Sequence, residues 1–215
     1  MKTITFVRHG QSVANAGGVT MAHDAIPLTP LGQRQAAELA NALALRPEKI
    51  LVSPYLRAQQ TAKPLCARLG MQPELHPLMH EFSTLDSAKM AGLNGDQRWP
   101  HVQAYWQAAD PTLRTGENAE TFEEFNARVA QFQAELPQLP HGTLCFGHGM
   151  WFALLIWRLL GFGTADSQGM SAFRRFQLGL PMPNCAVYHL VQAKDGHWRV
   201  QGAEPLMRQM MAVAG

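Results

Sequence analysis

The sequence predicts an α/β fold: a three-layer α/β/α sandwich in which a mostly parallel central sheet is flanked by helices. Segments rich in β-branched and aromatic residues alternate with segments of helical periodicity, and this alternation favours a parallel sheet covered on both faces. With 215 residues, and with no Gly/Ser-rich linker or internal repeat, the chain is expected to form one domain over residues 1–215.

Strand-like segments are expected in four places. The first covers residues 3–8, where the chain is β-branched and aromatic. The others lie around residues 50–52, 144–146 and 186–190, with an extension of the last through 198–200.

Helical segments are expected between these strands. Thr29-Pro30 forms an N-cap and first-turn pair for a helix, and Ser53-Pro54 opens a second. A capping-box-like sequence at Thr121 begins a third helix that runs to about residue 135. A fourth covers residues 150–160 and is apolar nearly all round.

The region from about residue 91 to residue 116 fits the alternation less well, because glycines and prolines interrupt it. It also carries the bulky rings of Trp99, Tyr105 and Trp106. Two interpretations stay open: a capping insertion over the functional site, or a surface excursion whose rings pack on the core.

The composition excludes several classes of protein. A net charge of +2 is too small to indicate a nucleic-acid-binding surface. The N-terminus lacks the apolar core of a signal peptide, and the longest apolar run, residues 150–157, is far shorter than the ~20 residues of a membrane helix. We therefore expect a cytoplasmic protein without nucleic-acid or membrane partners. Its cysteines, Cys66, Cys145 and Cys185, are expected to be reduced core residues.

The first strand ends on Arg8 and His9, followed by Gly10. Because an arginine is always cationic, it disfavours protonation of a neighbouring imidazole, and a neutral His9 can act as a nucleophile. Gly10 permits a sharp exit at the carboxyl end of the strand, where open α/β sheets bind their ligands. An Arg-His-Gly triplet alone recurs by chance, so other stretches have to support a site here.

Three further stretches supply candidate partners for His9. Arg57 lies in the first turn of the second helix, where an anion would remove its conflict with the helix dipole. His148 lies between two glycines, which let its imidazole approach a ligand closely. Glu81 lies in an apolar context, which together with a nearby phosphate favours the protonated form of a carboxyl group. The alternative for Glu81 is a structural pair with His80.

Two histidines, two arginines and a carboxylate form a consistent set for phosphoryl transfer, which needs a nucleophile, cations over the phosphoryl oxygens and an acid at the leaving oxygen. The polar loop after the first strand adds Gln11, Ser12 and Asn15 as candidate phosphate ligands.

These stretches resemble the histidine phosphatase superfamily, the phosphoglycerate mutase-like group. The motifs occur in the family's order between residue 3 and about residue 190. They are Val7-Arg8-His9-Gly10-Gln11-Ser12 with Asn15, Leu28-Thr29-Pro30-Leu31-Gly32 with Gln35-Ala36, Ser53-Pro54 with Arg57-Ala58 and Gln60-Thr61-Ala62, Glu81, and Gly147-His148-Gly149.

The resemblance implies that His9 forms a phosphohistidine while Arg8, Arg57 and His148 bind the phosphoryl oxygens, helped by Asn15 and Ser12. Glu81 would be the acid and later the base for water, with Asp86 and Glu117 as alternatives in a variable part of the family. No metal and no cofactor is implied. The family often has Trp before the loop asparagine, where this chain has Ala14.

The same residues suit a phosphatase or a mutase. A mutase needs a cationic pocket for an acidic substrate, and the variable middle of this chain offers few cations beyond Arg98 and Arg114. We therefore expect a phosphatase acting on a small organic phosphate monoester with an apolar or aromatic moiety, as a monomer or a homodimer. The alternatives are a cofactor-dependent phosphoglycerate mutase and a non-catalytic phospho-ligand-binding protein. Phe173-Arg174-Arg175-Phe176 is a further candidate for substrate binding, or a solvated helix end.

Overall fold

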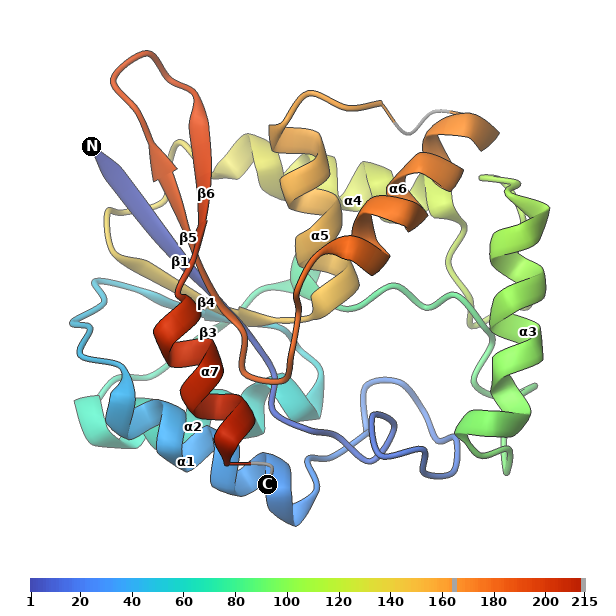
Figure 1. Cartoon of the computed structure of the whole chain (residues 1–215), viewed down its shortest axis with the longest axis horizontal. Coiled ribbons are helices and arrows are strands. Elements are labelled where there is room, and N and C mark those ends of the chain that lie inside the picture. The colour runs from blue at the N-terminus through green and yellow to red at the C-terminus, as the bar shows by residue number, and fades with distance from the viewer. Residues whose placement is uncertain (164–165, 214–215) are drawn as a thin grey trace.

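The computed structural model describes residues 1–163 and 166–213. It has a central sheet with helices on both faces (Figure 1). The strands are β1 Lys2–Arg8, β2 Ile50–Val52, β3 Glu74–Leu75, β4 Thr143–Gly147, β5 Val187–Gln192 and β6 Trp198–Gly202. The helices are α1 Pro30–Ala42, α2 Leu56–Leu69, α3 Gly95–Ala108, α4 Phe122–Glu135, α5 Gly149–Leu159, α6 Ser167–Gly179 and α7 Glu204–Ala212, with a 3-10 turn, η1 Pro77–Met79.

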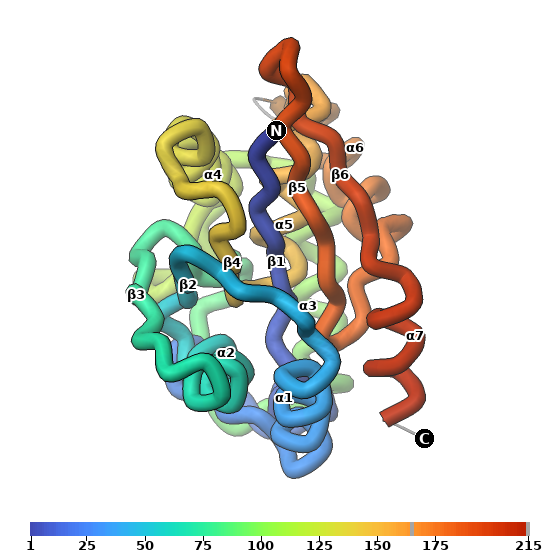
Figure 2. The backbone as a smooth tube through the Cα atoms, turned by 90° about the vertical axis from the view of Figure 1, so that its left-hand side faces the viewer, coloured from blue at the N-terminus to red at the C-terminus, as the bar shows by residue number. Residues whose placement is uncertain are grey.

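The strands lie in the order β3-β2-β4-β1-β5-β6 (Figure 2). The first four are parallel to one another, whereas β5 runs antiparallel to β1 and β6 antiparallel to β5. The predicted mostly parallel sheet is therefore confirmed. Since parallel strands end at the same edge, the carboxyl ends of β1, β2 and β4 meet there.

Alternate side chains of each strand reach different helical layers. Ile4 and Phe6 pack with the apolar faces of α4, α5 and α6. Val7, on the opposite face of β1, packs with α1, α2 and α7. The same alternation separates Cys145 from Leu144 in β4. The sheet thus has a helical layer on each face, which confirms the predicted three-layer sandwich.

Two helices begin at the caps that the sequence indicates. Thr29 Oγ1 accepts the backbone N–H of Gly32 at 3.1 Å at the start of α1. At the start of α4, Thr121 and Glu124 each accept the other's backbone N–H, at 3.1 and 2.9 Å. A side-chain N-cap of this kind stabilises a helix by about 1 kcal/mol.

Other boundaries differ from the sequence expectation. Helix α2 begins at Leu56 rather than at Ser53-Pro54, because the Ser53 hydroxyl is used elsewhere. The segment 198–200 is part of a separate strand, β6, since a turn with Gly196 at φ +87° reverses the chain after β5. Helix α7 is not anticipated from sequence, and α6 only as a helix end near residues 173–176.

The predicted insertion contains α3, which starts at a capping box formed by Asn94 and Gln97. Pro100 is accommodated inside this helix. Tyr105 and Trp106 are buried, and Trp106 packs edge-to-face on Phe122 with ring centroids 6.0 Å apart. These two rings therefore pack on the core, whereas a role of this segment in capping the site stays a prediction.

Two further features bear on the sequence expectations. Cys66, Cys145 and Cys185 are buried and free, as expected of core thiols. Within residues 1–163 and 166–213, no helix combines the length and the apolar character needed to cross a bilayer.

Candidate active site

Two histidines lie side by side at the carboxyl edge of the sheet. Arg8, at the end of β1, pairs with Gly147, at the end of β4, so the next residues, His9 and His148, leave the sheet together. Their ring centroids are 5.2 Å apart at an interplanar angle of 61°. Both residues are buried, with 4% and 0% of their surface exposed. The structure therefore brings together the two histidines that the sequence singles out.

The tautomer of His9 follows from its two hydrogen bonds. Its Nδ1 lies 2.7 Å from the carbonyl oxygen of Gly10, which can only accept, so Nδ1 carries the hydrogen. The Nε of Arg57 donates to the other ring nitrogen, Nε2, across 3.2 Å. The lone pair is therefore on Nε2, and Nε2 is the atom able to act as a nucleophile.

Burial favours the neutral form of both imidazoles. It is the largest cause that lowers the pKa of His9 well below the usual 6.5, followed by the positive charges of Arg57 and Arg8. The pKa of His148 is also well below 6.5, through burial first and then through Arg57. Arg8, the cause named from sequence, thus ranks behind burial and Arg57.

The ring of His148 is oriented by Ser53. Ser53 Oγ accepts the backbone N–H of Tyr55 at 3.2 Å and lies 2.7 Å from His148 Nε2. We assign the Ser53 hydroxyl as the donor to Nε2, the tautomer in which the hydrogen of the neutral imidazole lies on Nδ1; the second lone pair of the hydroxyl is the acceptor in the other tautomer. His148 Nδ1 is buried and has no hydrogen-bond partner in the described part of the chain. The arrangement leaves a buried donor beside His9.

Arg8 reaches the site against the first turn of α5. Its Nη1 donates to the carbonyl oxygen of Met182, whereas its Nε is buried with no hydrogen-bond partner among the described residues. A Cβ atom on Gly149 would lie 3.2 Å from that Nε. The sequence predicts that the glycines around His148 let a ligand approach closely. In the structure, Gly149 lets the Arg8 guanidinium pack closely on α5.

Arg57 lies in the first turn of α2, as the sequence indicates. Its Nη1 donates to the carbonyl oxygen of His23 at 2.7 Å, and its guanidinium carbon lies 4.9 Å from the ring centroid of Tyr55. Burial lowers the pKa of Arg57, and the negative charge of Glu81 opposes that effect. A cation at a helix N-terminus, beside a second arginine, is an arrangement that an anion would stabilise.

Gln11 fixes the loop after β1 to α1. Its backbone N–H donates to Gln35 Oε1 at 2.8 Å, and its Oε1 accepts from Thr29 Oγ1 at 2.7 Å. A Cβ atom on Gly10 would lie 2.7 Å from the carbonyl oxygen of Gly32, so the glycine permits this close packing rather than a positive φ. A phosphate contact of Gln11 stays a prediction.

Ser12 and Asn15 hold the same loop against the segment before β5. Asn15 Oδ1 accepts from Ser12 Oγ at 3.1 Å and from Asn184 Nδ2 at 3.0 Å. Asn184 Nδ2 also lies 3.3 Å from the carbonyl oxygen of His9. Asn15 is thus linked to the His9 backbone through Asn184, and Ser12 through Asn15. Phosphate binding by Ser12 and Asn15 stays a prediction.

The carboxylate of Glu81 caps a distant helix. Oε1 accepts the backbone N–H groups of Trp151 at 2.9 Å and Phe82 at 3.0 Å, and Oε2 accepts that of Met150 at 3.1 Å. Met150 and Trp151 belong to the first turn of α5, which follows His148 directly. Glu81 is therefore held at the helix end beside the second histidine.

The electrostatics favour Glu81 over the other carboxylates considered from sequence. Burial lowers the pKa values of Arg8 and Arg57, and the negative charge of Glu81 is the largest cause that opposes this effect at both arginines. The buried carboxylate of Asp86 accepts backbone N–H groups of its own turn, and Glu117 is exposed. Of the three carboxylates, Glu81 is therefore the best placed to act as a partner of Arg8 and Arg57.

Residues without a role in the sequence expectation also shape the site. Thr61 Oγ1 accepts the backbone N–H of Gly10 at 3.0 Å and donates to the carbonyl oxygen of Arg57 at 2.7 Å. Thr61 and Ser53 belong to a stretch that carries the resemblance, so that stretch could have pointed to them. The contacts of Asn184 come from far along the chain, and no local pattern marks them.

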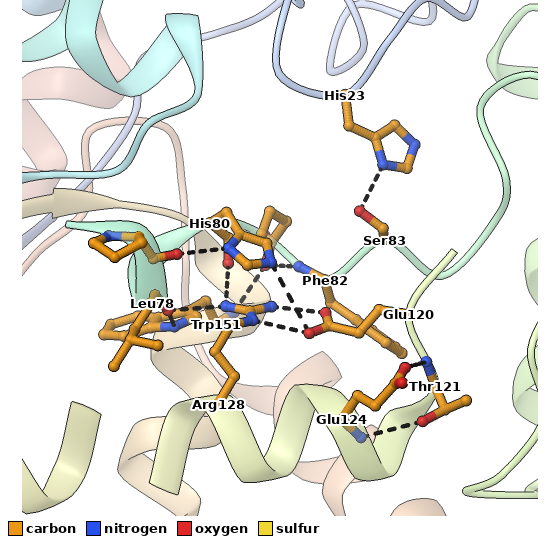
Figure 3. A network of polar contacts seen from close by, with 12 residues as sticks. His23, Leu78, His80, Phe82, Ser83, Glu120, Thr121, Glu124, Arg128 and Trp151 are labelled. Carbon is orange, nitrogen blue, oxygen red and sulfur yellow. Dashed lines mark hydrogen bonds and ion pairs between the residues drawn. The ribbon is translucent and has the colours of Figure 1, made fainter. Parts of the chain in front are cut away.

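A small pocket of about 180 Å³ adjoins the cluster between the loop after β1 and the segment that follows Glu81. His23 lines it, and His23 Nδ1 lies 2.9 Å from Ser83 Oγ (Figure 3). Most of its wall is apolar and includes Val19, Met21, Ile26, Phe82, Met90 and Val102. None of the predicted site residues lines this pocket; it meets the cluster through His23, whose carbonyl oxygen accepts from Arg57, and Phe82, whose N–H donates to Glu81. A larger pocket of about 530 Å³, at the amino end of β1, likewise includes none of them.

The arrangement is suited to in-line phosphoryl transfer. A neutral imidazole, whose Nε2 lone pair accepts a hydrogen bond from Arg57, lies beside two guanidinium groups, a second imidazole and one carboxylate.

The stretch from Phe173 to Phe176 lies inside α6. Its Arg174 guanidinium lies 4.8 Å from the Trp106 ring centroid. Over residues 1–163 and 166–213, no three His, Cys, Asp or Glu side chains gather as metal ligands.

The sequence is similar to those of known proteins. It matches the histidine phosphatase superfamily (branch 1) over residues 4–204. It is 31% identical over 163 residues to the adenosylcobalamin/alpha-ribazole phosphatase of Escherichia coli (strain K12), covering 72% of this chain and 77% of that protein. It is 27% identical over 207 residues to the probable phosphoglycerate mutase GpmB of Enterobacter sp. (strain 638), covering 94% and 90%.

Another relative is much longer than this chain. The PE-PGRS family protein PE_PGRS11 of Mycobacterium tuberculosis (strain ATCC 25618 / H37Rv) is 43% identical over 100 residues, which are 42% of this chain and 17% of that protein. Among solved structures, mycobacterial glucosyl-3-phosphoglycerate phosphatase superposes with a TM-score of 0.68 at 23% identity, covering 94% of this chain and 97% of the other. At that identity the likeness shows the fold.

Proposed function

The chain belongs to the histidine phosphatase superfamily (branch 1), and we propose that it hydrolyses a small organic phosphate monoester through a phosphohistidine on His9. One observation carries the proposal. Two buried donors, Arg8 Nε and His148 Nδ1, have no partner among the described residues and lie around the neutral His9. Buried donors are nearly always hydrogen-bonded, so their natural acceptors are the oxygens of a phosphoryl group.

In the first step, Nε2 of His9 attacks phosphorus while the ester P–O bond breaks. The hydrogen stays on Nδ1, which donates it to the Gly10 carbonyl oxygen, so the imidazole needs no change of tautomer before attack. Arg8, Arg57 and His148 bind the equatorial oxygens. Glu81, a carboxylate in the free site, takes up a proton from solvent when the phosphate dianion binds beside it, and gives that proton to the leaving oxygen. The products are an alcohol and phosphohistidine.

In the second step, water attacks the phosphorus and the N–P bond breaks. Glu81, now a carboxylate, takes the proton of the water, and inorganic phosphate leaves. Glu81 then releases a proton to solvent and His9 is neutral again, so the cycle closes without a further reactant. Neither a metal nor a cofactor takes part in either step.

The pocket beside the cluster supports a small apolar moiety on the ester. Its walls are largely aliphatic and aromatic. Its one arginine, Arg98, already donates through Nη1 to Gly18 O at 3.0 Å and Thr20 Oγ1 at 2.7 Å. A pocket with that lining favours an uncharged organic group over a second phosphate or carboxylate.

A phosphoglycerate mutase is the second candidate, favoured by the GpmB relative; the phosphatase relatives favour hydrolysis. A third is a binding protein without turnover. Two assays separate them: phosphate release from p-nitrophenyl phosphate, and isomerisation of 3-phosphoglycerate in the presence of 2,3-bisphosphoglycerate. We expect phosphate release alone. Isomerisation would favour the mutase, and absence of both activities would favour the binding protein.

His9→Ala provides the direct test of the intermediate. Wild-type protein and H9A are each mixed rapidly with p-nitrophenyl phosphate labelled in its phosphoryl group. We expect the wild type to retain an acid-labile phosphoryl label, the phosphohistidine, and H9A to retain none. The matched control is His197→Ala, because the His197 side chain is 85% exposed. Label retained by H9A, or lost by H197A alone, would contradict the assignment of the nucleophile.

The location, the substrate class and the assembly state of the protein are also open to test. We propose that it acts in the cytoplasm on a small-molecule phosphate ester, as a monomer or a homodimer, without nucleic-acid or membrane partners. Sedimentation at several protein concentrations checks the assembly state, and a panel of phosphorylated metabolites checks the substrate.

A further inference from the structure

A buried ion pair lies behind the segment that carries Glu81. Arg128 of α4 is 8% exposed and binds Glu120 through two hydrogen bonds, Nε to Oε1 at 2.8 Å and Nη2 to Oε2 at 2.7 Å (Figure 3). Its third nitrogen, Nη1, donates to the carbonyl oxygens of Leu78 at 2.9 Å and His80 at 2.7 Å. The guanidinium therefore joins α4 to the chain just before Glu81.

The same short segment is tied to α5. Leu78 O accepts the indole Nε1–H of Trp151 at 2.7 Å (Figure 3). The Glu81 carboxylate accepts the backbone N–H of Trp151 at 2.9 Å. Residues 78–81 are thus held between Arg128 on one helix and Trp151 on another. Apart from η1 at its start, this segment is neither helix nor strand, so these contacts define its course.

The ring of His80 takes no part in holding Glu81. Its Nδ1 lies 2.8 Å from the carbonyl oxygen of Pro77, and its Nε2 is 4.0 Å from Glu120 Oε1. These contacts differ from the His80–Glu81 pair considered from sequence. Burial and then the charge of Arg128 lower the pKa of His80, which favours a neutral ring beside the Arg128–Glu120 pair.

We propose that Arg128, held by Glu120, is a positioning residue for Glu81: it fixes the main chain of residues 78–81 so that the carboxyl group meets the leaving oxygen. This inference rests on the proposed function, in which Glu81 is the acid. Misplacing a catalytic group by about 1 Å costs on the order of a hundredfold in rate. The contacts of Arg128 are with the Glu81 segment, so its loss acts through the acid.

Arginine is required for this arrangement. Three nitrogens of one planar group reach a carboxylate and two carbonyls together, whereas a lysine offers a single ammonium. Glu120 is required as well, because a buried guanidinium without a counter-charge is costly. We therefore expect Arg128→Met, Arg128→Lys and Glu120→Gln to share one kinetic signature.

The signature is a dependence on the leaving group. An acid matters little for p-nitrophenolate, which leaves unassisted, and matters greatly for an alkoxide. Because Glu81 also serves the hydrolysis step that all esters share, the signature is read in kcat/KM, which reports the transfer to His9. We expect Arg128→Met to lower kcat/KM for glycerol 1-phosphate by about a hundredfold and for p-nitrophenyl phosphate by less than about threefold. Arg128→Lys and Glu120→Gln, which change less volume, should show the same pattern if Arg128→Met does not fold.

Arg114→Met is the matched control. Arg114 also lies near the start of α4, binds the helix residue Glu124 and donates to a backbone carbonyl, that of Ala119 at 2.5 Å. Its ion pair is partly exposed, with 42% and 50% of the two side chains accessible. We expect Arg114→Met to leave the ratio of the two substrates unchanged, although it removes an arginine–glutamate pair of the same kind.

The double variant Arg128→Met/Glu81→Gln completes the test. If Arg128 acts through Glu81, removing both should cost no more on glycerol 1-phosphate than Glu81→Gln alone. Independent, multiplying losses would overturn the inference, and so would equal losses on both substrates, which indicate a structural role. If Glu81→Gln itself shows no leaving-group dependence, the proposed acid fails, and that outcome is distinct from a failure of Arg128 alone.

Discussion

Arg57 Nε donates a hydrogen bond to His9 Nε2 across 3.2 Å, so the cation that we propose to bind phosphate holds the lone pair of the proposed nucleophile. The oxygens of a phosphate ester are anionic and are stronger acceptors than a neutral imidazole. We therefore expect the Arg57 N–H to exchange its hydrogen bond with Nε2 for one with a phosphoryl oxygen when substrate binds, which leaves the Nε2 lone pair free to attack phosphorus. The same contact explains why Arg57 lowers the pKa of His9.

Removing the charge of Arg57 should affect both chemistry and titration. In Arg57→Gln we expect kcat/KM for p-nitrophenyl phosphate to fall by about 10² to 10³-fold, as when a preorganised donor is removed. The pKa of His9 should rise, because a positive neighbour that disfavours imidazolium is lost; burial, the larger cause, keeps it below 6.5. Two-dimensional ¹H–¹⁵N NMR of the imidazole against pH measures the shift.

Arg68→Gln serves as the control on the same helix. Arg68, in the last turn of α2, donates to the carbonyl oxygen of Leu43 at 2.7 Å and lies outside the cluster. We expect the His9 titration and the kinetics to match the wild type. An Arg57→Gln protein whose His9 titrates as before would show that the Arg57 contact does not set its protonation.

Ser53→Ala tests the orientation of His148. Without the hydroxyl, His148 Nε2 loses its partner and the tautomer with hydrogen on Nδ1 is no longer favoured. We expect kcat to fall by about tenfold to a hundredfold and unfolding to become easier by about 1–3 kcal/mol, the usual cost of an unpaired buried group. ¹⁵N chemical shifts of His148 distinguish the tautomers, and Ser53→Thr, which retains a hydroxyl, should retain the wild-type tautomer.

The neighbourhood of His9 and His148 was within reach of the sequence. Each follows a β-branched or apolar run, and parallel strands end at one edge of the sheet, so local patterns plus topology place the two residues together. The caps at Thr29 and Thr121 are equally local signals, and both helices start there. Features that depend on a few adjacent residues were therefore predictable.

Features that depend on distant partners were not. Glu81 caps α5 from 70 residues away, and Arg128 reaches the Leu78 carbonyl from 50 residues away, so neither contact leaves a local pattern. Helix α3 contains Pro100 and begins with a glycine, signals that usually mark a break. Its capping box, a local signal, and the burial of Tyr105, a tertiary effect, outweigh them in a weak helical sequence.

Gly149 should be intolerant of even a methyl group. A Cβ atom there would lie 3.2 Å from Arg8 Nε and 3.1 Å from Met182 Cγ. We expect Gly149→Ala to displace the guanidinium and weaken competitive inhibition by inorganic phosphate about tenfold, the equivalent of one charge-assisted hydrogen bond. Inhibition constants measured with p-nitrophenyl phosphate report the change.

Gly179→Ala is the matched control, because Gly179 is also helical and a Cβ atom there would meet no described atom within 4 Å beyond its own stretch of helix. Alanine is the better helix former by up to about 1 kcal/mol. We therefore expect unchanged phosphate inhibition and equal or higher thermal stability for this variant. Equal inhibition constants for Gly149→Ala and wild type would contradict the close packing of Arg8 on α5.

The two buried histidines should make the protein sensitive to mild acid. Their pKa values lie well below 6.5 in the folded chain, chiefly because of burial, whereas in the unfolded chain both titrate near 6.5. Below about pH 6.5 the unfolded state therefore binds protons that the folded state does not, and stability falls as pH falls toward the folded pKa values. Each histidine contributes a slope of up to about 1.4 kcal/mol per pH unit.

His148→Asn isolates one of these contributions. His23, His80 and His189 also have lowered pKa values, so the wild-type slope is a sum, and the difference between the two proteins is the informative quantity. Urea unfolding between about pH 5 and pH 8 should show a shallower pH dependence for His148→Asn below about pH 6.5 and parallel curves above it. Parallel curves over the whole range would mean that His148 is protonated as readily in the folded protein as in the unfolded chain.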